Sequence, residues 1–262
     1  MAKNRRGEIS GAGEIRRWMQ ALALTAVLMA YPVSALWERE EAGAEVQEEV
    51  QAEVREEIQT EAQEEAQEEA QEGTSGVRPR VALTFDDGPS PEYTPLLLDG
   101  LREREVRASF FVIGSNIEKE GGEEIIRRMH EEGHLIGNHT WHHVDLSGLS
   151  TEDAWRELEM TDSRIREITG EETDLVRPPF GEFPQGLEEP DKLYVKWTVD
   201  SRDWVTKDTQ EIVRKVVTDT EENDIILMHD CYGTSVEAAL QIIDILSERG
   251  YEFVTVDRLL LD

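Results

Sequence analysis

RVALTFDDGPS, residues 80–90, runs from an apolar stretch directly into two adjacent carboxylates, Asp86 and Asp87, and then into a Gly-Pro pair. Neighbouring side chains of a regular strand point to opposite faces of the sheet, so one of the two carboxylates would face a core. An unpaired ion in a core is costly. A turn with both carboxylates in water is the simplest interpretation, because Asp, Gly and Pro are common turn residues. Whether the pair has another use depends on what the rest of the chain brings beside it.

The flanking sequence indicates an α/β domain that extends from residue 77 to residue 262. It contains seven apolar, strand-like runs, at 80–85, 108–114, 134–138, 174–179, 194–200, 224–229 and 251–256. Stretches with a helical pattern separate most of them, at 91–105, 122–132, 150–169, 208–221 and 234–249. This alternation predicts a parallel sheet covered by helices. Seven strands favour a barrel-like closure, one strand short of the usual eight. Segment 181–192 contains two prolines and leaves little room for a further helix.

Two other segments precede this domain. Residues 1–37 end in an uncharged stretch, 18–37, that follows four arginines. Such a stretch can just span a bilayer as a helix, and the basic residues before it direct the rest of the chain outward. An uncleaved membrane anchor and a signal cleaved after Ala35 both fit this pattern. Residues 38–76 carry fifteen Glu and two Arg, and we expect a partly helical linker or stalk, with a coiled coil as the alternative.

The composition restricts the partners. The formal net charge is −31, so we expect no binding of nucleic acid through its phosphates. The charge is interpreted as a well-solvated surface that resists aggregation. Cys231 is the only cysteine, which excludes an internal disulfide framework. The expected oligomeric state is a monomer.

Polar side chains follow the carboxyl ends of five predicted strands. They are Asp86 and Asp87, then His139, His142 and His143, then Arg177, then Asp200 and Asp203, and finally His229 and Asp230. In a parallel barrel these strand ends gather on one face, where such folds place their chemistry. The paired carboxylates therefore have histidines, an arginine and further carboxylates as expected neighbours.

This set of residues can bind a metal. His139 and His143 are four residues apart, so one helical turn would place both rings on the same side. Two imidazoles and one carboxylate leave a fourth position open for water, as catalytic zinc requires. His142 is the competing ligand, although on a helical turn its side chain points elsewhere. One Asp of the pair can bind the metal, and the other can take a proton from water whose pKa the metal lowers to about 7. His229 can then protonate a leaving group.

Five segments in this order resemble the motifs of the polysaccharide deacetylases, carbohydrate esterase family four: TFDDGP, HTWHH, RPPFG, DSRDW and LMH. The resemblance covers about residues 80–258. It implies a distorted (β/α) barrel, a divalent metal ion such as Zn²⁺, and removal of acetyl groups from N-acetylated sugars of peptidoglycan, chitin or related glycans. The chain departs from the pattern at Phe180, where Tyr is also common, and in its short segment 181–192.

The resemblance also assigns roles. Asp86 would be the general base, and Asp87 would bind the metal together with His139 and His143. Arg177 would pair with Asp86 and hold that carboxylate ionised and oriented, since an opposite charge favours the charged form.

Further roles follow around the acid, His229. The backbone N–H of Phe180, together with the metal, would stabilise an oxyanion. Asp203 and Trp204 would flank His229, with Asp203 favouring its protonated form. Leu227 would form part of the apolar pocket for the acetyl methyl group.

Three functions are compatible with these residues. The leading one is a metal-dependent N-deacetylase of an extracellular glycan, with peptidoglycan favoured over chitooligosaccharide by the anchor and stalk. The second is an O-acetyl esterase, in which the same attack expels an alkoxide instead of an amine. The third is a non-catalytic glycan-binding protein at the cell surface, which would lack a base, ligand or acid, whereas no motif here is broken. In each case we expect the domain outside the cytoplasm, membrane-anchored or secreted to the cell wall.

Overall fold

The computed structural model describes residues 78–182 and 192–261. They belong to the second of two compact units of the chain, Gln59–Asp262. The predicted anchor, the predicted stalk and most of segment 181–192 lie outside the described residues. No helix within the described ranges has the length and apolarity needed to cross a bilayer.

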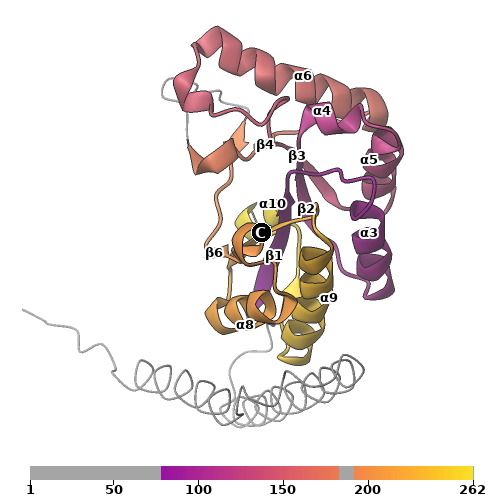
Figure 1. Cartoon of the computed structure of the whole chain (residues 1–262), viewed down its shortest axis with the longest axis vertical. Helices are drawn as coiled ribbons and strands as arrows, with labels where there is room; N and C mark the ends of the chain where they lie inside the picture. Colours follow the sequence, from indigo (N-terminus) through magenta and orange to yellow (C-terminus); the bar gives the residue numbers. More distant parts are fainter. Residues whose placement is uncertain (1–77, 183–191, 262) are drawn as a thin grey trace, which may run out of the picture. The chain divides into compact units, whose positions relative to one another are not determined.

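Short parallel strands form one sheet, drawn in Figure 1 with helices around it. The strands are β1 (Arg80–Asp86), β2 (Ser109–Val112), β3 (Leu135–Asn138), β4 (Leu175–Val176), β5 (Leu193–Tyr194), β6 (Val199–Asp200), β7 (Ile225–His229) and β8 (Glu252–Phe253). Their order in the sheet is β5-β4-β3-β2-β1-β7-β6, and β8 pairs with the first residues of β1 outside this path. The sheet is curled into a half-barrel, which confirms the predicted fold class.

All five predicted helices are present, as α3 (Thr94–Glu103), α5 (Gly122–Glu131), α6 (Thr151–Thr169), α8 (Thr209–Asp219) and α9 (Gly233–Glu248). Shorter helices that were not predicted are α4 (Gly114–Ile117), α7 (Asp203–Thr206) and α10 (Val256–Leu261), with 3₁₀ turns η2 (Leu146–Gly148) and η3 (Pro179–Gly181). Helices of four to six residues are too short to display a hydrophobic period.

The ends of α6 follow from its sequence. The side chain of Ser150 accepts a hydrogen bond from the N–H of Asp153 and so caps the first turn. Gly170 ends the helix with a φ of 80°, a left-handed conformation that glycine adopts without steric cost. Leu158 and Ile165 are buried beneath the helix, which fixes α6 beside β3.

The predicted fifth strand, 194–200, is two separate strands. β5 pairs with β4 at one end of the sheet, and β6 pairs with β7 at the other. Between them, the carbonyl groups of Val195 and Lys196 accept hydrogen bonds from the Arg177 guanidinium. The segment between β5 and β6 therefore links the two ends of the curled sheet. There the buried Arg177 side chain supplies hydrogen-bond donors that a neighbouring strand would otherwise supply.

The central strands β1, β2, β3 and β7 are buried on both faces along most of their length. On β1, Val81, Leu83 and Phe85 belong to the main cluster, which also holds apolar residues of α3, α5, α8 and α9. Ala82 points the other way, into a smaller cluster inside the curl. A parallel sheet that is covered on both sides requires a continuous apolar run, because successive side chains are buried on opposite faces of the sheet.

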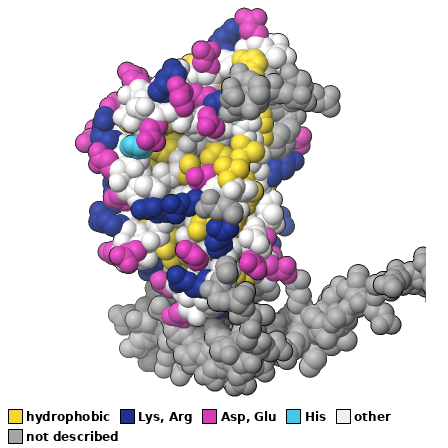
Figure 2. Space-filling model, turned by 180° about the vertical axis from the view of Figure 1, so that it is seen from behind, with side chains coloured by type: hydrophobic (Ala, Val, Ile, Leu, Met, Phe, Trp, Pro, Cys, Tyr) yellow, Lys and Arg dark blue, Asp and Glu magenta, His cyan; other side chains and the backbone are white. Residues whose placement is uncertain are grey.

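Charged side chains cover much of the surface. On the face shown in Figure 2, acidic and basic side chains are interspersed, with an apolar patch among them. Arg164 illustrates the mixing, because it forms ion pairs with Glu118, Glu123 and Glu167. Exposed pairs of this kind contribute little to stability individually.

Candidate active site

Both carboxylates of the DDGP segment point to the same side of the sheet, at the carboxyl end of β1. Asp86 shares the inner face of β1 with Ala82 by simple alternation. Asp87 should then point outward, but its φ of 72° lies in the left-handed region and returns its side chain to the inner side. As a result, the Nε2 atom of His139 lies 3.9 Å from Asp86 Oδ2 and 3.5 Å from Asp87 Oδ1. The adjacent charges serve one site.

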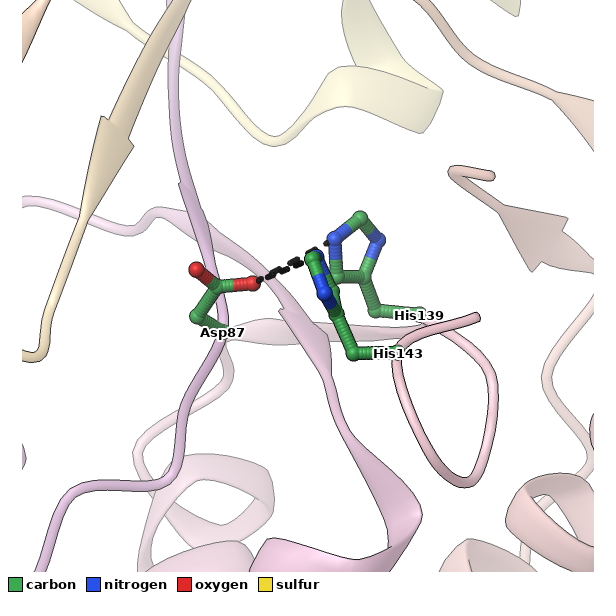
Figure 3. A group of neighbouring side chains, drawn as sticks. All are labelled: Asp87, His139 and His143. Carbon is green, nitrogen blue, oxygen red and sulfur yellow. Dashed lines mark ion pairs between the residues drawn. The ribbon is translucent and has the colours of Figure 1, made fainter. Parts of the chain in front are cut away.

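Asp87, His139 and His143 form a cluster of three potential metal ligands (Figure 3). The Nε2 atom of His143 lies 3.2 Å from Asp87 Oδ1, and one ligand atom from each residue lies within 4.8 Å of the others. Two imidazole nitrogens and a carboxylate oxygen are ligands that zinc and related divalent cations accept. The structure brings together the three residues that the sequence analysis selected.

The backbone conformation that brings the two histidine rings together differs from the prediction. The argument from one helical turn is wrong, because residues 139–145 form an irregular loop between β3 and η2. Thr140 and His143 have φ values of 65° and 55° and bend this loop, which leaves the rings of His139 and His143 5.1 Å apart. His142 points away, with its Nδ1 2.8 Å from a carboxylate oxygen of Glu157.

The chemistry of the cluster fits a divalent cation. The Oδ1 atom of Asp87 is buried and has no hydrogen-bond partner among the described residues. The Nδ1 of His139 lies 2.5 Å from the carbonyl oxygen of Arg177, so this nitrogen donates and the Nε2 lone pair faces Asp87. Burial lowers the pKa of His143 and favours its neutral, ligating form. For Asp87, burial opposes ionisation, but the surrounding histidines outweigh it and lower its pKa.

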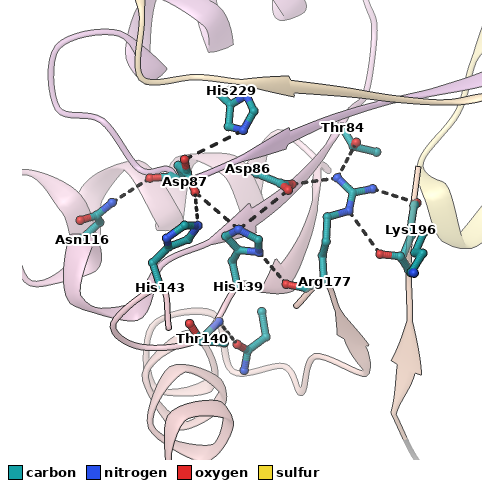
Figure 4. Close-up of polar contacts among 12 residues, drawn as sticks. Thr84, Asp86, Asp87, Asn116, His139, Thr140, His143, Arg177, Lys196 and His229 are labelled. Carbon is teal, nitrogen blue, oxygen red and sulfur yellow. Dashed lines mark hydrogen bonds and ion pairs between the residues drawn. The ribbon is translucent and has the colours of Figure 1, made fainter. Parts of the chain in front are cut away.

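Arg177 fixes the other carboxylate. Its side chain is fully buried, and its Nη1 donates hydrogen bonds to Asp86 Oδ1 at 2.8 Å and to Thr84 Oγ1 at 2.7 Å (Figure 4). The guanidinium carbon lies 4.1 Å from the centre of the Phe111 ring, a cation–π contact. Burial lowers the pKa of Arg177, while the charge and the hydrogen bond of Asp86 oppose that effect. The predicted pairing of Arg177 with Asp86 is therefore present as a buried ion pair.

A second charged pair lies on neighbouring strand ends. The Nδ1 of His229 lies 2.7 Å from Asp203 Oδ1, and the backbone N–H of His229 donates to Asp203 Oδ2 at 2.8 Å. Burial favours neutral His229, but Asp203, with smaller contributions from Asp86 and Asp87, raises the pKa of His229 to about 9. Its Nε2 lies 4.0 Å from Asp87 Oδ2 and so faces the metal-ligand cluster. The contact with Asp203 therefore favours the protonated form of His229.

The remaining predicted residues lie around this group. Leu227 is buried on β7, paired with Thr84, and lies two residues before His229 on the same face of the strand. Trp204 is half exposed on α7, next to Asp203. The Phe180 ring lies 4.9 Å from the His143 ring, centre to centre, and its side chain is 65% exposed.

Sequence reasoning missed several residues that support the site. Thr84 bonds Arg177, and its position two residues before Asp86 on an alternating strand could have indicated this. The Nδ2 of Asn116 donates to the backbone oxygen of Asp87 at 2.7 Å, a contact between distant segments that no local pattern marks. Asp230, one of the polar residues selected at the strand ends, lies in the turn after β7, where it is fully buried behind Gly88 and accepts a hydrogen bond from Thr94.

Two other candidates do not join the group. Asp200 accepts a hydrogen bond from the N–H of Arg202, so it stabilises the turn after β6. Cys231 follows Asp230 in the chain, and burial raises the pKa of its thiol to about 12, which leaves it unreactive at neutral pH.

Comparison with known proteins gives the class. Residues 73–192 match the family model described as polysaccharide deacetylase. A peptidoglycan-N-acetylglucosamine deacetylase of Bacillus cereus is 35% identical over 189 residues, which are 69% of this chain and 87% of that protein. The chain therefore belongs to the polysaccharide deacetylase family.

Other relatives carry related names. The peptidoglycan-N-acetylmuramic acid deacetylase PdaC of Bacillus subtilis is 40% identical over 180 residues, which are 68% of this chain and 38% of PdaC. The solved structure of PdaC superposes with a TM-score of 0.68 at 37% identity and covers 71% of this chain and 92% of that structure. A family 4 acetyl xylan esterase from Clostridium thermocellum, solved with a cobalt ion, has a TM-score of 0.65 at 33% identity and covers 69% of this chain and 90% of that one.

The similarity is confined to part of the larger relatives. The chain spans about two fifths of the length of the first curated relatives that it matches, 38% in each case.

Proposed function

We propose that this protein is a metal-dependent N-deacetylase that removes acetyl groups from amino sugars of peptidoglycan outside the cytoplasm. The observation that carries the proposal is the placement of two ion pairs, Asp86 with Arg177 and His229 with Asp203, beside one cluster of potential metal ligands. A base and an acid near a common point are what hydrolysis of an amide requires.

Asp87, His139 and His143 would hold a divalent cation, and their two nitrogens and one oxygen favour Zn²⁺. When bound, the cation supplies a Lewis acid for the acetyl carbonyl and for water. The buried Oδ1 of Asp87 supports this assignment, because within the described residues it accepts no hydrogen bond while two imidazole nitrogens lie close to it, an arrangement that a bound cation would satisfy.

The chain's own residues move the protons. Asp86 accepts a proton from the attacking water as its oxygen bonds to the acetyl carbon. Arg177 orients Asp86 and balances its charge through the 2.8 Å contact. The backbone N–H of Phe180 is assigned to the developing oxyanion. His229 then donates its Nε2 proton to the sugar nitrogen as the carbon–nitrogen bond breaks, which releases acetate and a free amine.

Two side chains are assigned to the substrate. Leu227 would contact the acetyl methyl group, since it is the buried apolar residue on the face of β7 that carries His229. The half-exposed Trp204 would contact the sugar, because an exposed indole beside a polar site suits a carbohydrate face.

The choice of substrate rests on the relatives. Those reported above from Bacillus cereus and Bacillus subtilis are named for peptidoglycan N-acetylglucosamine and N-acetylmuramic acid. Chitooligosaccharide is the other N-acetylated glycan we consider. The predicted segment 18–37, as anchor or cleaved signal, would bring the domain to the cell wall, and a monomer is sufficient because every assigned residue comes from one chain.

An O-acetyl esterase is the second candidate, supported by the structural similarity to the acetyl xylan esterase. A non-catalytic glycan-binding protein is the third, and it has less support because the residues assigned as base, ligands and acid lie together.

One experiment separates these functions. The purified protein is incubated with muropeptides, with N-acetylchitooligosaccharides and with acetylated xylan, with and without a chelator, and products are analysed by mass spectrometry. The proposal expects loss of acetyl from muropeptide amino sugars that the chelator abolishes and added zinc restores. Release from xylan alone would establish the esterase, and binding without release would establish the non-catalytic protein.

A further inference from the structure

The loop that carries His139 and His143 is held on both sides by neighbouring elements. On one side, the first two backbone N–H groups of α4, from Gly114 and Ser115, donate to the carbonyl oxygens of Thr140 and Trp141 at 3.0 Å each. On the same side, a Cβ atom at Gly114 would lie 2.3 Å from the Trp141 ring, so the indole packs directly on the glycine backbone.

On the other side, Glu157 of α6 supplies the acceptors. Its Oε2 accepts the backbone N–H of Trp141 at 3.1 Å and of His142 at 2.8 Å. Its Oε1 lies 2.8 Å from the Nδ1 of His142. The Glu157 side chain is only 14% exposed, so its carboxylate is committed to this loop rather than to solvent.

The backbone N–H groups of this loop have few other hydrogen-bond acceptors. Thr140 N–H is bonded to the Asn138 side chain at 2.7 Å, and His139 N–H to the carbonyl of Val112 at 2.9 Å. Trp141 and His142 are the next two residues, and both of their N–H groups point to the one carboxylate. The segment between the two histidine ligands thus depends on Glu157 for its remaining donors.

This anchorage matters because the loop adopts an unfavourable backbone. Thr140 and His143 both have positive φ, which a non-glycine residue adopts at a cost. Such a conformation persists only where its surroundings over-determine it. The positive φ values are also what aims the His143 ring at Asp87, 3.2 Å from its Oδ1.

We propose that Glu157 is a positioning residue for the metal ligands: by binding the backbone between His139 and His143 it holds His143 in the orientation that completes the cluster with Asp87. His142 is then part of this anchorage and not a ligand. The inference rests on the proposed metal site, which Glu157 itself does not touch.

The size of the effect follows from metal sites in general. Removing a group that orients a ligand typically weakens metal binding by about 10- to 100-fold. Glu157→Ala leaves two N–H groups without their acceptor and frees the loop, so we expect a loss in that range. His142→Ala removes only the ring contact and keeps both backbone hydrogen bonds, so we expect less than about a fivefold loss. Glu157→Gln keeps a carbonyl oxygen for the two N–H groups, and we expect near-normal binding.

The test measures metal binding without reference to turnover. The full chain and its variants are stripped of metal and titrated with Co²⁺, following the visible absorption spectrum, and Zn²⁺ affinity is measured by competition with a chromophoric chelator. Thermal unfolding of the metal-free proteins shows whether each variant is folded. Glu159→Ala is the matched control, because Glu159 is an exposed glutamate on the same helix. His143→Ala, which removes a ligand, sets the scale for a broken site.

The proposal expects Glu157→Ala to bind both metals at least tenfold more weakly and to shift the Co²⁺ spectrum, with Glu157→Gln, His142→Ala and Glu159→Ala close to the unsubstituted chain. It is overturned if folded Glu157→Ala binds as tightly as the control, or if Glu157→Gln loses as much as Glu157→Ala. If Glu157→Ala does not fold, the test rests on Glu157→Gln. Weakened metal affinity or an altered Co²⁺ spectrum in Glu157→Gln overturns the proposal, and unchanged affinity and spectrum support it. Failure of the unsubstituted chain to bind either metal would instead remove the metal site from the proposed function, and the positioning role with it.

Discussion

At the scale of single residues, Asp86 and Asp87 show how adjacent identical side chains acquire different tasks. Asp86 ends a strand and meets a buried guanidinium at 2.8 Å. Asp87 has a left-handed backbone and faces two imidazole nitrogens. The two carboxylates have different surroundings although they are the same residue type, and the proposed roles of proton acceptor and metal ligand follow from those surroundings.

This separation leads to the first prediction. Asp86→Asn should keep the metal but lower turnover by about 10²-fold or more, because the amide cannot accept the water proton. Asp87→Asn should instead weaken metal binding, since it removes an anionic ligand. Metal content by atomic emission and turnover by acetate release are measured on both. Equal metal content in the two variants would mean that the roles of the neighbours are assigned wrongly.

The second prediction concerns His229, whose pKa Asp203 raises to about 9. An acid must be protonated to act, so the rate should fall as pH rises through the pKa of His229 and give a basic limb. A cation bound to Asp87 adds positive charge nearby and places this limb below 9. Asp203→Asn removes the charge that favours the imidazolium, so the limb should move down by about one pH unit or more.

The measurement is the pH dependence of kcat/KM for the unsubstituted chain and for Asp203→Asn, with metal content as the control. Asp200→Asn is the matched variant, because Asp200 only accepts a hydrogen bond from the N–H of Arg202. A basic limb that stays in place in Asp203→Asn would show that another group controls His229.

At the scale of elements, the site depends on short segments packed against long ones. The four-residue helix α4 meets the histidine loop through Gly114, where a Cβ atom would lie 2.3 Å from the Trp141 ring and 2.5 Å from Thr161 Oγ1. Thr161 is buried on α6, and the backbone of Trp141 is bonded to Glu157, so the indole could withdraw only by rotating about its own side-chain bonds.

The third prediction follows from this contact. Gly114→Ala should destabilise the protein by about 1–3 kcal/mol, because an added methyl group in a filled space forces its neighbours apart. Gly148→Ala is the control, since nothing lies within 4 Å of a Cβ atom there. Thermal unfolding of the two metal-free variants provides the comparison, and equal melting temperatures would refute the close packing of α4 on the loop.

At the scale of the whole molecule, the described domain contains its own core. The buried residues of all three apolar clusters lie between Val81 and Val256. A chain with its apolar core in one contiguous range is expected to fold without its flanking segments.

The fourth prediction is that residues 77–262, expressed alone, fold and bind metal as the full chain does. A longer fragment starting at Gln59, where the second compact unit begins, is the control. Thermal unfolding and chelator competition are compared for both fragments. A lower melting temperature or weaker metal binding in the shorter fragment would show that residues 59–76 contribute to the folded domain.

The sequence by itself determined the parallel α/β architecture and the five longer helices, because these depend on periodicity. It selected the candidate site residues from residue types at strand ends and from the resemblance to a known family. Parallel strands bring their carboxyl ends to one face, so His139, His143 and one of the paired carboxylates could be selected together. The resemblance to the family chose Asp87 as that carboxylate.

Only the tertiary structure decided how those residues meet. Backbone dihedrals at Asp87, Thr140 and His143 aim the ligands, and no residue there is a glycine that would signal a positive φ. Likewise, the fifth strand is divided because a buried guanidinium takes the carbonyl groups of Val195 and Lys196. Glu157 binds the loop from a helix fifteen residues away in sequence. Contacts of this kind arise from packing between distant segments, and a local pattern carries no signal for them.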